Sequence, residues 1–475
     1  MNETPKILLE PQRRVTVHGE YDIVVVGGGP AGIAAAVAAA MHGSRTLLVE
    51  RYGFLGGMGT AAGVTNFFGL FANIHGEIRQ VVHGIVDELL ARIDRLGGLN
   101  APHLVKGKTK AQAYDTAAYK GAADDLLIAK GVDVLFHALA AGVIMNPDET
   151  IRALLIETKS GRRAVLGKVF IDCSGDGDLS AWAGAPFELG DGAGNTLYPT
   201  MMFRVNGVDP QAAGEAWRSI GRCMEEAERG GAKLPGKHAI LRPQRNPIEW
   251  RVCVTKLRKD DGTAIDGTNA VELSAGEIEG RRQAFAFFEF LRREVPGFGN
   301  AYIVDIPPQL GIRETRRIVG RHQLSGDDVA SCASFDDRIG INGLPIDNHI
   351  AGDVRWTWPN VQDSRGYYDL PYRMLLPLGV RNLLIAGRCA SMTHEGQSAG
   401  RASGACFVMG QAAGTAAHLA VAADREPDEI SVERLQEVLE DDGVCLECDN
   451  ERRQVEKSRT VTLSSAAPMT MESLP

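Results

Sequence analysis

A glycine-rich turn between an apolar strand and a small-residue helix constrains the fold more than any other part of this chain. Residues 21–26 predict a short buried strand, residues 27–32 carry the pattern G-x-G-x-x-G, and the alanine-rich residues 33–42 predict a helix. A second apolar run, residues 46–49, ends in Glu50. Strand, turn, helix, strand and terminal acid together predict a βαβ unit of the dinucleotide-binding type.

The glycines and the acid of this unit each have a physical role. Gly27 allows the tight turn, and Gly29 lets the backbone approach a pyrophosphate, whose charge meets the N–H groups at the start of the helix. Gly32 lets the helix pack closely on the strand. Glu50 can accept hydrogen bonds from both hydroxyls of an adenosine ribose, which favours FAD or NAD over NADP. The motif alone does not separate FAD from NAD.

Composition narrows the classes of partner. The net charge is -9 and no basic stripe is present, which argues against nucleic acid. No apolar run reaches the ~20 residues that span a bilayer, so no membrane span is expected. The first 20 residues lack the apolar core of a signal peptide, which predicts a cytoplasmic protein. Eight scattered cysteines fit a reducing compartment, and the single pair Cys445 and Cys448 predicts free thiols rather than a metal site.

Beyond the first unit, periodicity predicts an alternation of helices and strands, then a middle region of mixed character without any nucleotide signature, and later a strand followed by a long small-residue helix. The predicted segments are helices at 76–96 and 116–130, a strand at 132–136, a hairpin within 143–158, a strand at 164–172, the middle region at 190–370, a strand at 383–386 and a helix at 400–421.

Four stretches together carry a family resemblance: residues 21–50, 50–58, 171–178 and 382–414. They resemble a FAD-dependent oxidoreductase of the glutathione-reductase-like superfamily, and most of all its bacterial branch known simply as FAD-dependent oxidoreductases. The resemblance covers most of residues 15–425. It implies an α/β fold with a Rossmann-type FAD-binding domain and an inserted α+β substrate domain. The implied ranges are 15–190 and 371–425 for FAD binding, 191–370 for the substrate or cap domain, and 426–475 for a C-terminal helix and mobile tail.

The resemblance also implies which residues meet the cofactor, FAD. They are Gly27, Gly29, Pro30, Ala31, Gly32, Glu50, Arg51, Gly56, Gly57, Met58, Asp172, Gly175, Asp176, Gly387, Arg388 and Gly400. Many relatives carry an aspartate after the glycine at 387, where it binds a ribityl hydroxyl. This chain has Arg388, whose charge can meet phosphate instead. The helix expected to start near Gly400 can point its N-terminus at the O2 edge of the flavin.

Three residues are candidates for chemistry. His394 lies between the ribityl-binding strand and the flavin-facing helix, where it can take a proton during hydride transfer, or simply hold the loop or contact the flavin. Arg313 opens a run with three arginines in five residues that can clamp an anionic substrate, or pair with Glu314 to fix domain packing. Arg401 can anchor a substrate carboxylate or flavin O2, or be a solvated helix residue.

The leading interpretation is an enzyme that transfers hydride between a small organic substrate, one that can bear a carboxylate, and flavin N5. No second G-x-G-x-x-G follows a strand, so a built-in NAD(P) domain is not expected. Two alternatives stay open: a flavin monooxygenase, which residues 171–178 faintly resemble, and a flavin-carrying subunit of a redox complex. The expected partners are a small-molecule substrate and either a second copy of the chain or an external electron acceptor.

Overall fold

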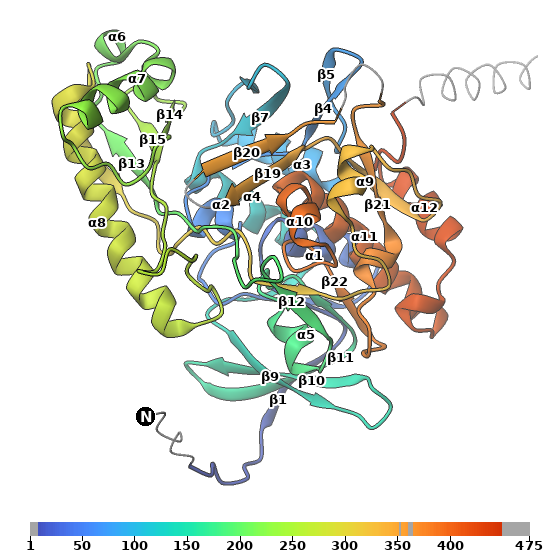
Figure 1. Cartoon of the computed structure of the whole chain (residues 1–475). Helices are drawn as coiled ribbons and strands as arrows, with labels where there is room; N and C mark the ends of the chain where they lie inside the picture. Colours follow the sequence, from blue (N-terminus) through green and yellow to red (C-terminus); the bar gives the residue numbers. More distant parts are fainter. Residues whose placement is uncertain (1–7, 351–352, 360–363, 449–475) are drawn as a thin grey trace, which may run out of the picture.

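The computed structural model describes residues 8–350, 353–359 and 364–448 (Figure 1). Its main sheet has seven strands, and five of them run parallel in the order β8-β2-β1-β11-β22. Their bounds are β1 Thr16–Val26, β2 Thr46–Val49, β8 Asp133–Leu135, β11 Gly161–Asp172 and β22 Leu383–Ile385. Strands β9 (Leu139–Met145) and β10 (Ile151–Thr158) extend β11 as an antiparallel meander. The predicted α/β class and parallel βαβ sheet are confirmed.

The register of the parallel strands brings four distant loops to one edge. Val26 pairs with both Val49 and Asp172, and Asp172 pairs with Ile385, so these strands end at the same level. The loops that follow them therefore lie together, although they are up to 360 residues apart in the sequence. In open α/β sheets, this carboxyl edge is where ligands bind.

Alternating side chains give the sheet two different faces. Ile23 and Val25 join the larger core with helices α1 (Pro30–Met41), α3 (Ile85–Arg95), α4 (Thr116–Ala129) and α11 (Ser403–Ala423). Val24 and Val26 join a second core with the β9–β10 meander and α5 (Asp178–Trp182). Residues 23–26 of β1 are buried on both faces, as the continuous run of valine and isoleucine predicted, whereas the part of the strand before residue 23 is exposed or half-buried.

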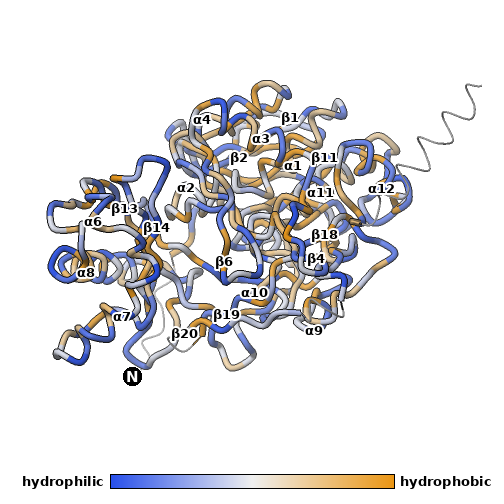
Figure 2. The backbone as a smooth tube through the Cα atoms, turned by 90° about the horizontal axis from the view of Figure 1, so that it is seen from above, coloured by the Kyte–Doolittle hydropathy of each residue, from blue (hydrophilic) through white to orange (hydrophobic). Residues whose placement is uncertain are grey.

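Helices α1 and α11 pack with their backbones in contact. A Cβ atom built on Gly410 or Gly414 would lie 2.1 Å from the carbonyl oxygen of Ala31 or Ala35. By length and hydropathy α11 could cross a membrane, but 78% of its most apolar window is buried inside the protein. In Figure 2 the apolar segments of β1, α1 and α11 lie together within the main body.

A separate lobe carries the cap (Figures 1 and 2). Its antiparallel sheet has the order β14-β15-β13-β16, and it packs with its own helices around a core that extends from Phe203 to Ala301. The bounds are β13 Met202–Asn206, α6 Pro210–Ala213, α7 Ala216–Arg229, β14 Ile240–Pro243, β15 Trp250–Cys253, α8 Ala270–Glu294 and β16 Tyr302–Asp305.

The predicted cap range of 191–370 is too long at its C-terminal end. Residues 324–370 contribute α9 (Gly326–Ala330), β18 (Arg338–Asn342) and β21 (Tyr368–Pro371) to the larger core of the main body. None of these elements contributes a residue to the core of the cap. This segment also forms the hairpin of β19 (Ile346–Ile350) and β20 (Asp353–Thr357). Helix α12 (Val432–Asp441) packs on the same core through Leu435 and Leu439, and the predicted tail beyond residue 448 lies outside the described residues.

Two predicted helices differ from the structure. The segment predicted as helix 76–96 begins with β5 (Glu77–Gln80), which pairs with β4 (Phe71–Ile74), and α3 starts only after Gly84. The long helix expected at 400–421 is α11, which starts three residues later at Ser403, and a separate short helix that was not predicted, α10 (His394–Gly400), precedes it. The remaining short elements are α2 Met58–Ala61, β3 Asn66–Phe67, β6 His103–Val105, β7 Thr109–Ala113, β12 Phe187–Leu189, β17 Arg316–Ile318, η1 Tyr372–Leu375 and η2 Pro427–Glu429.

Candidate active site

A cavity of about 700 Å³ extends from the carboxyl edge of the main sheet toward the cap. Cofactor and substrate pockets commonly have volumes of ~300–1,000 Å³. Most of the residues predicted to meet the cofactor line this cavity: Gly27, Gly29, Pro30, Ala31, Glu50, Arg51, Gly57, Met58, Gly175, Gly387 and Arg388. These residues form the part of the cavity wall at the edge of the sheet, and other segments that were not predicted form the rest.

The start of α1 and the end of β2 form one end of the cavity. Gly29 is the N-terminal capping residue of helix α1 and provides no side-chain hydrogen bond to the first turn. The N–H groups of that turn are therefore available to an anion. Glu50 is buried, and its two carboxylate oxygens accept hydrogen bonds from the backbone N–H groups of Gly28 at 2.7 Å and Tyr52 at 2.9 Å. The carboxylate is thus fixed in place while it lines the cavity.

Arg388 is held by its neighbours at the next part of the wall. Its guanidinium donates to Asp176 Oδ1 at 2.9 Å and to Thr315 Oγ1 at 2.9 Å. Asp176 also lies 3.9 Å from Arg51, but it does not itself line the cavity. Its carboxylate therefore positions two arginines, and this differs from the direct cofactor contact that was predicted for it.

Four other predicted cofactor residues do not reach the cavity: Gly32, Gly56, Asp172 and Gly400. Asp172 is fully buried, and its carboxylate accepts hydrogen bonds from Ser174 and Ser180, so it fixes the turn after β11. Gly400 ends α10, where a Cβ would lie 2.4 Å from the sulfur of Met392. These residues shape the backbone behind the wall.

His394 is not among the residues that line the cavity. Its Nδ1 lies 3.0 Å from Oε2 of Glu314, whose side chain is fully buried. Glu314 also accepts from the N–H of Leu197 at 2.8 Å and forms a buried ion pair with Arg317. His394 therefore belongs to a network of hydrogen bonds and ion pairs that links the segment leading into the cap, at Leu197, to the main body. This arrangement agrees with the alternative role predicted for His394, which was to hold its loop in place.

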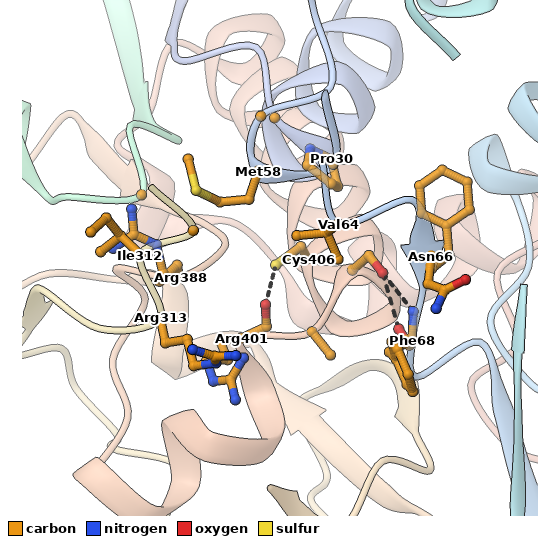
Figure 3. A pocket seen from close by; sticks show the side chains of 18 of the residues that line it. Pro30, Met58, Val64, Asn66, Phe68, Ile312, Arg313, Arg388, Arg401 and Cys406 are labelled. Carbon is orange, nitrogen blue, oxygen red and sulfur yellow. Dashed lines mark hydrogen bonds between the residues drawn. The ribbon is translucent and has the colours of Figure 1, made fainter. Parts of the chain in front are cut away.

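A cluster of four charged or titratable side chains faces the cavity instead: Arg313, Arg401, Asp347 and His349. Figure 3 shows the Arg313 and Arg401 side chains next to each other, below Met58 and Pro30. Arg401 Nη2 donates to Asp347 Oδ2 at 3.3 Å, and His349 Nε2 lies 3.1 Å from the same oxygen. Arg401 Nε and Asp347 Oδ1 are buried without a hydrogen-bond partner.

Burial and charge set the protonation of this cluster. Burial, with the nearby Arg313, lowers the pKa of His349 to about 4, so this imidazole is neutral at pH 7. Burial lowers the pKa of Arg401 to about 10. Burial alone would raise the pKa of Asp347, but His349, Arg401 and Arg313 bring it below its ordinary value. Two guanidinium groups thus lie near one carboxylate, although only that of Arg401 pairs with it directly, and the cluster keeps an excess positive charge.

Sequence reasoning found the two arginines but missed Asp347 and His349. They are two residues apart on β19, so their side chains lie on the same face of the strand. Ser403, at the start of α11, was also missed; it lines the cavity, and its hydroxyl accepts from the N–H of Phe68 at 2.8 Å. Within the described part of the chain, no group of three or more His, Cys, Asp or Glu residues could hold a metal ion.

Comparison with known proteins gives a family and several distant relatives. The family model for "FAD dependent oxidoreductase" matches residues 22–439. Mitochondrial dihydrolipoyl dehydrogenase of Caenorhabditis elegans is 34% identical over 102 residues, which are 21% of this chain and 20% of that protein. The Schizosaccharomyces pombe enzyme of the same name is 43% identical over 58 residues, or 12% and 11%. The matched segments therefore span at most about a fifth of these relatives.

Among solved structures, a geranylgeranyl bacteriochlorophyll reductase-like protein of Thermoplasma acidophilum matches with a TM-score of 0.48 and 14% identity, over 89% of this chain and 84% of that one. The anhydrotetracycline hydroxylase OxyS of Streptomyces rimosus matches with a TM-score of 0.43 and 14% identity, over 88% and 65%.

Proposed function

The chain belongs to the family of FAD-dependent oxidoreductases, and from this premise we propose that it transfers hydride between flavin N5 and a small organic substrate that carries a carboxylate. The observation that carries the proposal is the cluster of Arg313, Arg401, Asp347 and His349 on the cavity wall. Its excess positive charge, largely removed from water, favours an anionic ligand.

The residues at the other end of the cavity fit FAD. The uncapped N-terminus of α1 suits a pyrophosphate, and Glu50 suits the ribose hydroxyls. Arg51 and Arg388 add positive charge beside them. Bound FAD supplies a centre that accepts or donates two electrons as hydride.

The protein groups then have separate tasks. Arg313 and Arg401 hold the substrate carboxylate by charge-assisted hydrogen bonds, so the reacting carbon is kept in one orientation. His349 is neutral at pH 7 and can accept the proton that leaves the substrate as it is oxidised, or return it in the reverse direction. Asp347 orients the imidazole through its 3.1 Å contact and stabilises the imidazolium that forms.

A panel of short carboxylic acids tests this proposal, with the corresponding amides as uncharged controls. Each compound is added anaerobically to the FAD-loaded protein while the visible flavin spectrum is recorded. We expect acids to perturb or bleach the flavin bands and amides to leave them unchanged. Arg401→Gln should weaken the response at least about tenfold, whereas Arg316→Gln should not, because Arg316 does not line the cavity. Equal responses to acids and amides would overturn the proposal.

Variants of two histidines test which of them accepts the proton: His349, proposed from the structure, or His394, the candidate from the sequence. With an acid that bleaches the flavin, His349→Gln should slow anaerobic reduction by ~10²–10⁴-fold at saturating substrate. His394→Gln should leave that rate nearly unchanged. The opposite ranking would restore His394 as the proton acceptor. Bleaching that requires a nicotinamide, followed by oxygen consumption with a hydroxylated product, would instead support a monooxygenase.

A further inference from the structure

A second arginine site lies on the cap side of the same cavity. Arg251, on strand β15, is only 4% exposed and lines the cavity. Its Nη1 donates to the carbonyl of Val64, and its Nε has no hydrogen-bond partner. With the Asn66 amide turned so that its oxygen faces the guanidinium, this oxygen accepts from Nη1 at 3.0 Å and from Nη2 at 2.9 Å.

No carboxylate balances this charge. In the described ranges of the chain, Arg251 forms no ion pair, and the charged or titratable groups that act on it are Cys253, Tyr114 and a second arginine, Arg242. Burial, together with Arg242 and Arg251, lowers the pKa of the neighbouring His103 to about 4, so this imidazole adds no charge at pH 7. A buried, uncompensated guanidinium is costly unless an anion completes its environment.

The strand relates this site to the first arginine cluster. Arg251 and Cys253 are two residues apart on β15, so they point to the same face about 7 Å from each other. Both line the cavity, and Cys253 is within hydrogen-bond reach of Arg313. Two cationic sites therefore line one cavity, and the strand that carries Arg251 also carries Cys253, which adjoins Arg313.

We infer that the substrate is a short dicarboxylate, with one carboxylate bound by Arg313 and Arg401 and the other by Arg251. The inference rests on the proposed function and adds the second acidic group to it. Arg242, which lines the cavity near Arg251, adds positive charge to that end. The end nearest His349 is the one at which the proton is exchanged.

Spectral titration of the FAD-loaded protein tests the inference without identifying the natural substrate. The probes are saturated monocarboxylates and dicarboxylates of equal chain length, from four to six carbons, and inorganic phosphate. We expect the best dicarboxylate to bind about 10-fold to 150-fold more tightly than its monocarboxylate, since a hydrogen bond to a charged group contributes ~1.5–3 kcal/mol. Equal affinities would overturn the inference while leaving the proposed function intact. No response to any acid would overturn both.

Variants locate the second site. Arg251→Gln should remove the advantage of the dicarboxylate and leave the monocarboxylate affinity unchanged. The matched control is Arg204→Gln, which alters the facing strand, where Arg204 already pairs with Glu249 at 2.8 Å. If Arg251→Gln does not fold, the wild-type comparison of the two acid series still decides the matter. Equal weakening of both series by Arg251→Gln, weaker FAD binding in that variant, or phosphate binding better than every dicarboxylate would contradict the assignment.

Discussion

Replacing Gly29 or Gly32 by alanine is expected to have opposite effects, although the two glycines are only three residues apart. The first change should affect cofactor binding and the second the stability of the protein. A Cβ on Gly29 would lie 3.7 Å from its nearest neighbour, Gly57 Cα, and the backbone there, with φ of -77° and ψ of -175°, suits any residue. A Cβ on Gly32 would lie 1.8 Å from the carbonyl oxygen of Gly27. Alanine at 29 should therefore leave the stability of the fold unchanged, and alanine at 32 should lower it.

The expected magnitudes follow from these distances. The methyl of Gly29→Ala would project where the pyrophosphate is expected to meet α1, and losing one charge-assisted hydrogen bond of ~1.5–3 kcal/mol weakens FAD binding about 10-fold to 150-fold. For Gly32→Ala, real Cβ contacts stay beyond 3.0 Å, so a shift of about 1.2 Å is needed. Helix α1 is also in backbone contact with α11, which leaves it little room to move. Overpacking of this kind costs ~1–3 kcal/mol.

Two measurements distinguish the variants. Fluorescence titration of the apoprotein gives the FAD Kd, and thermal unfolding of the apoprotein gives Tm. With an unfolding entropy of ~2.1 cal/mol/K per residue, a chain of 475 residues loses about 1 °C for each kcal/mol. Gly29→Ala should keep the wild-type Tm and lose FAD affinity; Gly32→Ala should lower Tm by about 1–3 °C. Wild-type FAD affinity in Gly29→Ala would refute the close approach of cofactor and backbone.

Three further predictions concern charged and titratable side chains. Arg317→Met removes one partner of a buried ion pair and should destabilise the protein by ~3–5 kcal/mol in urea unfolding. The side chain of Arg316 is 22% exposed, so the control Arg316→Met should cost under ~1 kcal/mol. Equal losses of stability in the two variants would contradict this prediction. The pKa of His349 is lowered to about 4, so the unfolded chain protonates first and stability should fall by up to ~3 kcal/mol between pH 6.5 and 4; a His349→Gln variant that loses as much stability as the wild type would disprove this origin. A hydrogen bond from Cys448, with the charges of His83 and Arg79, lowers the pKa of Cys445 to about 7. The rate of iodoacetamide labelling of Cys445, measured by peptide mass spectrometry, should therefore be half-maximal near pH 7. A midpoint near the ~8.5 of free cysteine would contradict this prediction.

The structure also explains why two side chains predicted for the site do not line the cavity. Asp172 lies next to cofactor-contacting loops in the sequence, but its carboxylate has four hydrogen bonds from Ser174 and Ser180 and none to spare for the cavity wall. His394 was favoured because its loop precedes the long helix, yet the buried Glu314 holds its ring. In both cases the segment was predicted correctly, and the direction of the side chain depended on a partner elsewhere in the fold.

By itself the sequence determined the local unit from Gly27 to Glu50, because strand, turn and helix there follow from apolar periodicity and from backbone geometry that glycine permits. It also pointed to Arg313 and Arg401 through the motifs that carry them. Only the tertiary structure brought Asp347 and His349 beside those arginines and brought Arg251 to the same cavity. These residues come from segments about 35 to 150 residues apart, and the packing of whole elements, rather than the spacing of residues along the chain, decides which charges share a cavity.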